Sequence, residues 1–343
     1  MGEKEIRGFP GGVHPTDGQD KSLTAGKLVK EYWPGSVTIL SEQSLNAKCS
    51  LMVKPGDQVL AGQLIGEPQS FTAAPLHASV SGIVREVKKI SSQDREILAC
   101  VIERTGEPEE KSFPHENEAA DISEYSEDVI IEGLLTGGLI GMGGAGFPVH
   151  KKYETEKRID TILINGAECE LFLTCDCRVM VEQGYGVING TRLMLKASGA
   201  DQAYICIEDN KPDAIKNLQK ILEEMKSQGY FEKEKPVQVQ VLPTKYPQGG
   251  ERQLIESVLG REVPMGGLPA DVGVIVSNVG TAKAAADVVL GKKPLISRIV
   301  TVTGNVKEPG NYLVPIGTSA KELIQLCGGV TTPANRVIAG GPM

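Results

Sequence analysis

Several features that would assign this chain of 343 residues to a functional class are missing from its sequence. No stretch approaches the roughly 20 apolar residues that a membrane-spanning helix needs, and because no apolar run follows the first residues, we expect no secretory signal. Lysine and arginine together number 36 against 44 aspartates and glutamates, which leaves a net charge of −8. Because nucleic-acid binding requires a basic surface, we expect no nucleic-acid partner and no transmembrane segment.

Cysteine and histidine are scarce, with seven and four residues. An odd number of cysteines spread along a long chain favours reduced thiols in the cytoplasm over a disulfide framework. Cys169, Cys175 and Cys177 are clustered, but their spacing fits neither a zinc nor an iron–sulfur signature. We interpret them as small buried residues and expect no metal in this chain.

The residue type that is abundant is glycine, with 40 residues. Glycine provides tight turns and lets a ligand approach the backbone, although a turn-rich β fold would have the same composition. The length predicts two or three domains. We predict the first over residues 1–110, because short strands at residues 37–40, 51–53 and 82–87 alternate with glycine and proline turns. An acidic stretch with prolines follows, and residues 111–125 are predicted to be a linker.

Residues 126–292 are predicted to form a second domain, in which helices and strands alternate. Helices are expected from Ser126 to Gly137, along the apolar stripe of residues 215–225, and from Thr281 onward. Short apolar strands are expected at residues 161–164, 203–207, 237–241 and 272–276. This alternation predicts a three-layer α/β domain with a largely parallel sheet.

The last part, residues 293–343, is predicted to be a small third domain. It contains a strand at residues 298–303 and a helix whose start has the capping-box spacing of Ser319 and Glu322. A final strand is expected from residue 336, continuing into Met343. Because the chain stops where a strand is beginning, we expect the sequence to be truncated.

A run of glycines offers the first candidate binding site, Gly-Met-Gly-Gly-Ala-Gly-Phe-Pro at residues 141–148. Backbone without side chains lets a flat ring or a phosphate lie against it, and its N–H groups can bind an anion. A flexible turn uses the same residues, and spacing alone slightly favours that interpretation.

Polar loops follow three of the predicted strands of the second domain. They read Asn-Gly-Ala-Glu-Cys-Glu at residues 165–170, Lys-Tyr-Pro-Gln-Gly-Gly-Glu at 245–251 and Ser-Asn-Val-Gly-Thr at 277–281. Ligands of parallel sheets bind at the carboxyl ends of the strands, so these loops are candidates for contacts to ribityl, ribose and carboxamide groups. The alternative is a set of ordinary turns with solvated glutamates.

Together these motifs resemble the flavin-binding fold shared by RnfC, the C subunit of Rnf electron-transport complexes, and the 51 kDa NADH-oxidising subunit of respiratory complex I. The resemblance to RnfC covers essentially the whole chain. Its further motifs are GFPGGVHP at residues 8–15, ASVSG at 78–82, IEDNK at 207–211, GGLPAD at 266–271 and GGPM at 340–343.

The resemblance implies an N-terminal barrel-sandwich hybrid of β structure, a central Rossmann-like flavin domain and a C-terminal β-grasp unit of the SLBB type. The first domain also looks like a biotinyl or lipoyl carrier. It has no lysine in a recognisable attachment setting, so a docking or scaffold role is favoured.

The resemblance also implies which residues form the site, with no catalytic side chain because FMN itself carries the hydride. The glycines of the first loop would shape the FMN site, Phe147 would lie near the flavin or nicotinamide ring, and Lys152 would reach the flavin. The implied cofactor-binding residues are Gly141, Gly143, Gly144, Gly146, Phe147, Lys152, Asn165, Glu168, Glu170, Tyr246, Gly249, Gly250, Glu251, Asn278 and Thr281.

The chain departs from the family pattern in two respects. Relatives usually read Glu-Pro-Tyr-Leu-Thr-x-Asp-Asp-Arg where this chain has Leu171 in place of the proline and Cys177 in place of a carboxylate. We expect the first change to loosen the loop. The family also continues into two cysteine clusters for 4Fe–4S centres, which this sequence lacks, so we expect these centres only in a missing C-terminal segment.

The function implied is an NADH:acceptor oxidoreductase module with FMN as cofactor and NADH as substrate. Its partners would be the other Rnf subunits at the cytoplasmic face of the membrane, where the chain would be peripheral, and indirectly ferredoxin. Two alternatives stay open. One is a soluble NADH-dependent flavoprotein of the proline-reductase-associated type, and the other is a non-enzymatic assembly module with a degraded flavin site.

Overall fold

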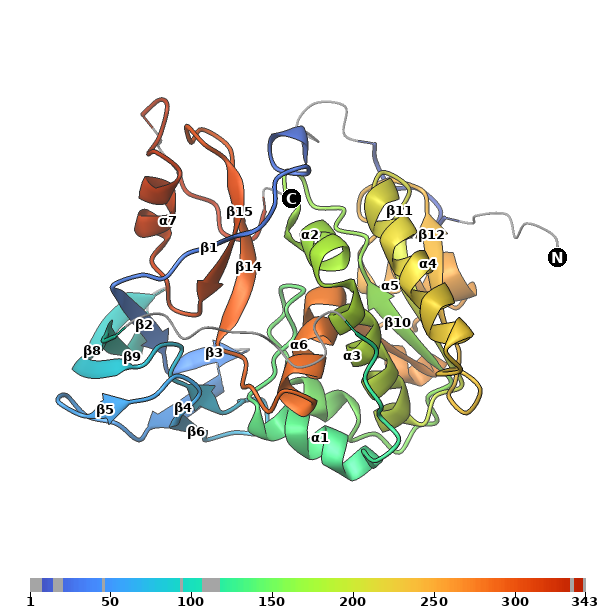
Figure 1. The fold of residues 1–343 in the computed structure, drawn as a ribbon, viewed down its shortest axis with the longest axis horizontal. Helices are drawn as coiled ribbons and strands as arrows, with labels where there is room; N and C mark the ends of the chain where they lie inside the picture. Colours follow the sequence, from blue (N-terminus) through green and yellow to red (C-terminus); the bar gives the residue numbers. More distant parts are fainter. Residues whose placement is uncertain are drawn as a thin grey trace.

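The structure is a computed structural model that describes residues 8–14, 21–44, 47–92, 95–106, 118–333 and 336–341. It contains a β-rich N-terminal unit, a central α/β unit and a small C-terminal unit, which are coloured blue to cyan, green to orange, and red in Figure 1. The predicted fold class is confirmed. The domain bounds 1–110, 126–292 and 293–343 stay predictions, and most of the predicted linker lies outside the described residues.

The N-terminal unit consists of two four-stranded sheets, in the orders β2-β9-β8-β5 and β3-β4-β6-β7. Val37, Ile65 and Ile102 are among the side chains buried in its core. Of the strand expected at residues 51–53, only Leu51 lies in a strand, as the last residue of β4. The strands are β2 (Ser36–Leu40), β3 (Glu42–Ser44), β4 (Ala47–Leu51), β5 (Gln58–Val59), β6 (Leu64–Pro68), β7 (Leu76–His77), β8 (Gly82–Ser92) and β9 (Arg95–Arg104).

The central unit is built on a four-stranded sheet in the order β12-β11-β10-β13. All three pairings are parallel, which confirms the prediction. The strands are β10 (Thr161–Asn165), β11 (Gln202–Glu208), β12 (Val237–Leu242) and β13 (Val274–Asn278). The last strand was expected to begin at Val272, but that residue ends the 3-10 helix η3 (Pro269–Val272), and Gly273 turns the chain into β13 with a φ of 77°.

Helices cover both faces of this sheet and make the three predicted layers. One face packs against α1 (Glu127–Thr136), α2 (Cys175–Glu182), α3 (Gly184–Ser198), α4 (Pro212–Ser227) and α6 (Val279–Val289). The other face packs against α5 (Glu251–Leu259). The sequence patterns did not predict α2, α3 or α5. Most of α3 is buried, so it has no polar stripe from which a helical period could be read.

The C-terminal unit pairs β14 (Ser297–Val302) antiparallel to β15 (Gly310–Pro315) and carries α7 (Ala320–Leu326). Ser319 caps α7 by accepting a hydrogen bond from the Lys321 N–H, whereas Glu322 bonds Tyr32 instead of completing the box. The strand expected from residue 336 is wrong, because residues 336–341 form no ladder. Met343 lies outside the described residues.

The N-terminal segment crosses from one unit to another. After the 3-10 helix η1 (Lys21–Leu23), strand β1 (Lys30–Glu31) pairs parallel with β15, so residues near the start of the chain extend the C-terminal sheet. Figure 1 shows this segment running past α2 toward β15. Within the described residues, no helix combines the length and the apolar character that crossing a bilayer requires.

Two glycines of α3, one helical turn apart, face α6 where the two helices pack closely. A β-carbon on Gly190 would collide with the carbonyl oxygen of Ala282 in α6. A β-carbon on Gly186 would lie 3.1 Å from Cγ of Lys283, which belongs to a flexible side chain. The two positions therefore differ in what an added methyl group would meet.

We predict that Gly190→Ala lowers the free energy of unfolding by about 1–3 kcal/mol or more, because backbone must move to relieve the overlap. Gly186→Ala should be neutral or stabilising by up to about 1 kcal/mol, since alanine favours a helix and the Lys283 stem can shift. Chemical denaturation of both variants measures this difference. Equal effects of the two substitutions would contradict the predicted packing.

Candidate functional site

The parallel pairing of β10 with β13 brings two asparagines side by side at the carboxyl edge of the sheet. Asn165 and Asn278 are register partners at the ends of these strands. Oδ1 of Asn278 accepts hydrogen bonds from the N–H groups of Gly280 at 2.8 Å and Thr281 at 3.4 Å, so it caps α6. The carboxyl edge is therefore joined to the first turn of a helix, the position at which anions bind.

The glycine loop, residues 141–148, lies against this helix start. The N–H of Met142 donates to Oγ1 of Thr281 at 2.9 Å, and a β-carbon on Gly143 would lie 3.4 Å from Cβ of Asn278. Gly143 and Gly144 are exposed, and a β-carbon on Gly144 would meet no described atom within 4 Å. The loop therefore exposes its backbone to solvent at Gly143 and Gly144, while the hydrogen bond of Met142 holds it against the start of α6.

The base of the glycine loop is closed by its own backbone. The N–H of Gly141 donates to the carbonyl oxygen of Phe147 at 2.8 Å, and Ile140 forms a bridge with Pro148. Gly146 adopts a φ of 62°, which favours glycine. A pocket lined by Met142, Gly280 and Arg298, among others, adjoins this loop between α6 and β14.

Lys152 extends from the 3-10 helix η2 (Val149–Lys152) to the neighbouring strand. Its Nζ donates to the carbonyl oxygen of Val276 in β13 at 2.6 Å. Burial lowers the pKa of this ammonium group, and the nearby charge of Glu251 opposes the shift. Lys152 therefore places a cation under the carboxyl edge, close to the start of α5.

The loop after β12 forms the third side of the edge. Nδ2 of Asn165 donates to the carbonyl oxygen of Gly249 at 2.8 Å, and the Gly249 N–H donates to Sγ of Cys169 at 3.3 Å. Gly250 is the N-cap of α5, and the exposed Glu251 is the first residue of this helix. Tyr246 exchanges two backbone hydrogen bonds of 2.8 Å with Val13, so the N-terminal segment borders this loop.

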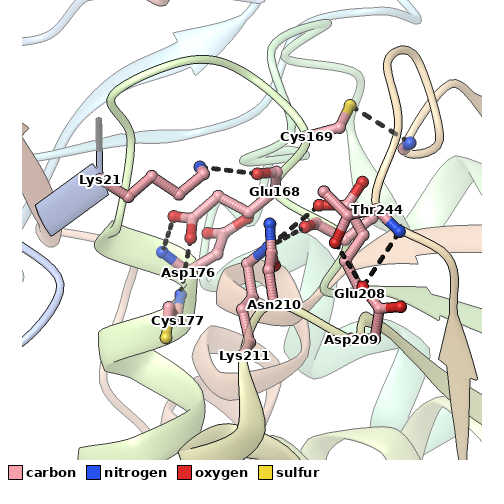
Figure 2. Close-up of polar contacts among 12 residues, drawn as sticks. Lys21, Glu168, Cys169, Asp176, Cys177, Glu208, Asp209, Asn210, Lys211 and Thr244 are labelled. Atoms are coloured by element: carbon pink, nitrogen blue, oxygen red, sulfur yellow. Dashed lines mark hydrogen bonds and ion pairs between the residues drawn. The ribbon is translucent and has the colours of Figure 1, made fainter. Parts of the chain in front are cut away.

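Glu168 is buried, and its carboxylate is directed at α2. Oε1 accepts a hydrogen bond from the Asp176 N–H at 2.7 Å and Oε2 accepts one from the Cys177 N–H at 3.3 Å (Figure 2). Burial, followed by the charge of Asp176, raises the pKa of Glu168 to about 7. The resemblance implied that this residue lines the flavin site, but its carboxylate caps the first turn of a helix.

Glu170 has different surroundings in the same loop. It is half-buried, and its Cγ and its carboxyl group both lie against Gly341. Its charge contributes to the raised pKa of Tyr246, behind burial as the main cause. Glu170 and Tyr246 therefore lie near each other.

The sequence patterns missed the lysines that hold the β10–α2 loop. Nζ of Lys21 donates to the carbonyl oxygens of Glu168, Glu170 and Leu173 at 2.8, 2.9 and 2.5 Å. Nζ of the buried Lys211 donates to the carbonyl oxygen of Ala167 at 2.5 Å and pairs with the buried Glu208 at 3.2 Å. Figure 2 shows Lys21 and Lys211 converging on the loop from different elements.

One of the two lysines left a signal in the sequence. Glu208 ends a buried strand and Lys211 follows it by three residues, so two charged residues lie at the carboxyl end of β11, where ligand sites form. No local pattern marked Lys21, because its partner Glu168 is 147 residues away in the sequence.

Glu168, Cys175 and Asp176 hold three potential metal ligands within 4.8 Å of one another. The Glu168 oxygens accept hydrogen bonds from backbone N–H groups, and Oδ2 of Asp176 accepts a hydrogen bond from the side-chain amide Nδ2 of Asn278 at 2.6 Å. Burial raises the pKa of the Cys175 thiol and keeps it protonated. We assign no metal to this group.

Three protein families match successive parts of the chain. The RnfC barrel sandwich hybrid domain matches residues 7–107, the Nuo51 FMN-binding domain matches residues 135–287, and the SLBB domain matches residues 299–343. Among solved structures, an NAD+-reducing [NiFe]-hydrogenase in the H2-reduced state superposes with a TM-score of 0.54 at 23% identity. It covers 60% of this chain and 40% of its own, and the likeness concerns the fold.

Similar proteins extend over nearly the whole chain. The C subunit of the proton-translocating ferredoxin:NAD+ oxidoreductase complex of Clostridium ljungdahlii is 41% identical over 98% of this chain and 72% of its own length. The corresponding subunit of the Na+-translocating complex of Acetobacterium woodii is 38% identical, with 98% and 74% covered. The C subunit of the ion-translocating oxidoreductase complex of Vibrio cholerae is 33% identical over 98% of this chain, which spans 42% of that protein. This chain belongs to the RnfC family, the C subunits of ion-translocating ferredoxin:NAD+ oxidoreductase complexes.

Proposed function

We propose that this chain binds FMN at the carboxyl edge of its central sheet and that NADH is oxidised there. The observation that carries the proposal is the bare backbone of Gly143 and Gly144, exposed and fixed against the capped start of α6. When bound, FMN accepts a hydride and can release electrons singly. The chain's own part is to bind and orient the two rings, which requires no general base.

The residues at this edge fit a flavin phosphate and ring. The starts of α5 and α6 both face the edge, and helix starts favour an anion such as a phosphate. The bare backbone of Gly143 and Gly144 leaves room for an isoalloxazine ring, and we propose that Lys152 and Asn165 supply charged and polar groups to the same site. We therefore retain the residues implied by the resemblance as the proposed site, with Glu168 reassigned to holding α2.

The loop stays anchored despite the two substitutions at residues 171 and 177, which supports an active site over a degraded one. Leu171, in place of proline, is buried with 8% of its surface exposed. The Cys177 N–H donates to Glu168, and Lys21 binds three carbonyl oxygens of the loop. The loosening expected from the loss of proline is thus opposed by bonds from outside the loop.

At the level of the assembly, we propose that the chain is the NADH-oxidising module of an ion-translocating complex. Its named relatives are subunits of such complexes, which supports other complex subunits as partners. We further propose that it is peripheral at the cytoplasmic membrane face, and that electrons pass through 4Fe–4S centres of the complex toward ferredoxin. A soluble flavoprotein remains the alternative, and isolation of the complex with this chain bound distinguishes the two.

One prediction concerns the glycine loop. Gly143→Val should lower the affinity for FMN at least about tenfold. A preformed ligand site leaves space for its ligand, and the branched side chain would fill the space proposed for the ring. Quenching of flavin fluorescence measures the affinity. Gly35→Val is the matched control, since Gly35 is also open to solvent within the described part of the chain. Unchanged FMN affinity of Gly143→Val would exclude this surface as the flavin site.

Another prediction concerns Glu170. Its carboxylate is proposed to accept hydrogen bonds from the ribose hydroxyls of NADH, and a charge-assisted bond contributes about 1.5–3 kcal/mol. Glu170→Gln should raise the NADH concentration needed for flavin reduction about tenfold or more and leave FMN bound. Stopped-flow reduction measures the change, with Glu262→Gln, beyond the far end of α5, as control. Reduction kinetics equal to the parent's would remove Glu170 from the site.

The pH dependence of stability follows from the buried carboxyl of Glu168. Its pKa is raised to about 7 from 4.5, so the folded protein holds this proton more tightly than the unfolded chain. The stability that this provides is present below pH 4.5 and is lost as the pH rises through 7. The parent's free energy of unfolding should therefore fall by about 3 kcal/mol relative to Glu168→Gln over this range. A difference that does not vary with pH in denaturation experiments would refute the assignment.

A further inference from the structure

The N-terminal residues 21–29 form a clasp around the loop and helix that follow β10. Within this clasp, the carbonyl oxygen of Ala25 accepts a hydrogen bond from Nη1 of Arg178 at 3.1 Å, and the Val29 N–H donates to Oε1 of Glu182 at 3.1 Å. Both partners belong to α2. The clasp therefore holds the far end of α2, while Lys21 holds the loop before it.

A buried hydrogen-bond network fixes the clasp to the C-terminal unit as well. The side chain of Thr24 bonds Thr174 at 2.8 Å, and Nδ2 of Asn311 donates to the carbonyl oxygen of Thr24 at 3.0 Å. Thr24, Thr174 and Asn311 are all buried. The position of Lys21 is consequently set by contacts with two other units.

Lys21 meets a site that suits an ammonium group. Three carbonyl oxygens of the β10–α2 loop converge on Nζ, which matches the three N–H donors of a lysine. The loop has an unusual backbone to achieve this, since Glu168 and Phe172 adopt φ values of 47° and 64°. Non-glycine residues rarely adopt this region, so the loop depends on contacts from outside to keep its shape.

The electrostatic surroundings of Lys21 come from several elements. Burial lowers the pKa of its ammonium group, and Glu168 on the loop is the strongest opposing charge. Lys211 lowers this pKa further, whereas Glu208 at the end of β11 raises it. Lys21 is thus a cation held among carbonyls and carboxylates, and no uncharged side chain of similar length reproduces that.

We propose that Lys21 is a positioning residue for the nicotinamide nucleotide. By binding the backbone oxygens on either side of Glu170 and that of Glu170 itself, it fixes the direction in which the Glu170 carboxylate points. This inference rests on the proposed function, because Glu170 is the group assigned to the ribose. Lys21 itself is proposed to touch neither the substrate nor the flavin.

The test compares four variants of the full chain loaded with FMN. Lys21→Met keeps the length of the side chain and removes its donors, Lys21→Gln keeps uncharged N–H donors, and Lys21→Arg keeps charge and donors. Lys27→Met is the matched control, because Nζ of Lys27 donates to a single carbonyl oxygen, that of Pro309, at an exposed position of the same clasp.

The NADH dependence of flavin reduction should change, and the limiting rate and FMN affinity should not. Lys21→Met should raise the NADH concentration for half-maximal reduction about tenfold or more, since three bonds to a charged group are lost. Lys21→Gln should have an intermediate value, and Lys21→Arg and Lys27→Met should match the parent. Hydrogen exchange of residues 166–174 should be faster in Lys21→Met, with β11 and β12 unaffected.

A double-mutant cycle separates positioning from general stability. If Lys21 acts through Glu170, Lys21→Met should have little further effect in the Glu170→Gln background. Additive effects, or a Lys21→Met variant with lowered stability but the parent's NADH dependence, would overturn the proposal. If Lys21→Met does not fold, the order of Lys21→Gln and Lys21→Arg decides, and equal values for these two would also overturn it.

The outcome for Lys21 can be told apart from the outcome for the proposed function. A parent chain that binds no FMN, or whose flavin NADH does not reduce, contradicts the proposed function. In that case hydrogen exchange of residues 166–174 in the flavin-free variants still tests whether Lys21 fixes the loop. Unchanged exchange in Lys21→Met would overturn the inference.

Discussion

The in-register parallel pairing of β10 with β13 is the constraint on which the carboxyl edge depends. It places Asn165 beside Asn278, and a slip of one strand by one residue would turn the side chains of that strand to the opposite face and separate the two asparagines. From this pair the contacts spread outward, through the cap of α6 to the glycine loop and through Gly249 to the start of α5. Because both strands are almost entirely buried, the hydrophobic core fixes the register, and the register fixes the polar groups.

Charged side chains from distant segments hold the β10–α2 loop at the carboxyl edge of the sheet. Lys21 and Lys211 approach the β10–α2 loop from different elements and bind its carbonyl oxygens, while Glu168 binds N–H groups at the start of α2. Buried charges are costly unless they are paired and hydrogen-bonded, and these meet that condition. The loop is therefore held by the N-terminal clasp, the end of β11 and α2 together, which makes its conformation a property of the whole molecule.

The sequence predicted the strands and polar loops of the central unit because a short run of neighbouring residues is enough to recognise each of them. Apolar runs of strand length predicted β10 and β11, and the polar loops after β10, β12 and β13 lie together because parallel strands share a carboxyl edge. The sequence patterns did not predict α3, because burial on nearly all sides removes the amphipathic period. They did not predict α2, because that helix is short. Lys21, the pairing of β1 with β15 and the turn of Glu168 toward α2 depend on contacts between distant residues, which no local pattern encodes. The strand expected from residue 336 into Met343 began with apolar residues typical of a strand, but residues 336–341 have no partner strand among the described residues.

The central claim is that a flavin lies over Gly143 and Gly144 with its other face open to a nucleotide held by Glu170. A crystal structure of this chain with FMN and a non-reducible NADH analogue tests that claim most directly. We expect the isoalloxazine ring against the glycine loop, beside Lys152 and Asn165, and the nucleotide ribose within hydrogen-bond distance of the Glu170 carboxylate. A flavin bound elsewhere, or a nucleotide whose ribose lies away from Glu170, would contradict it.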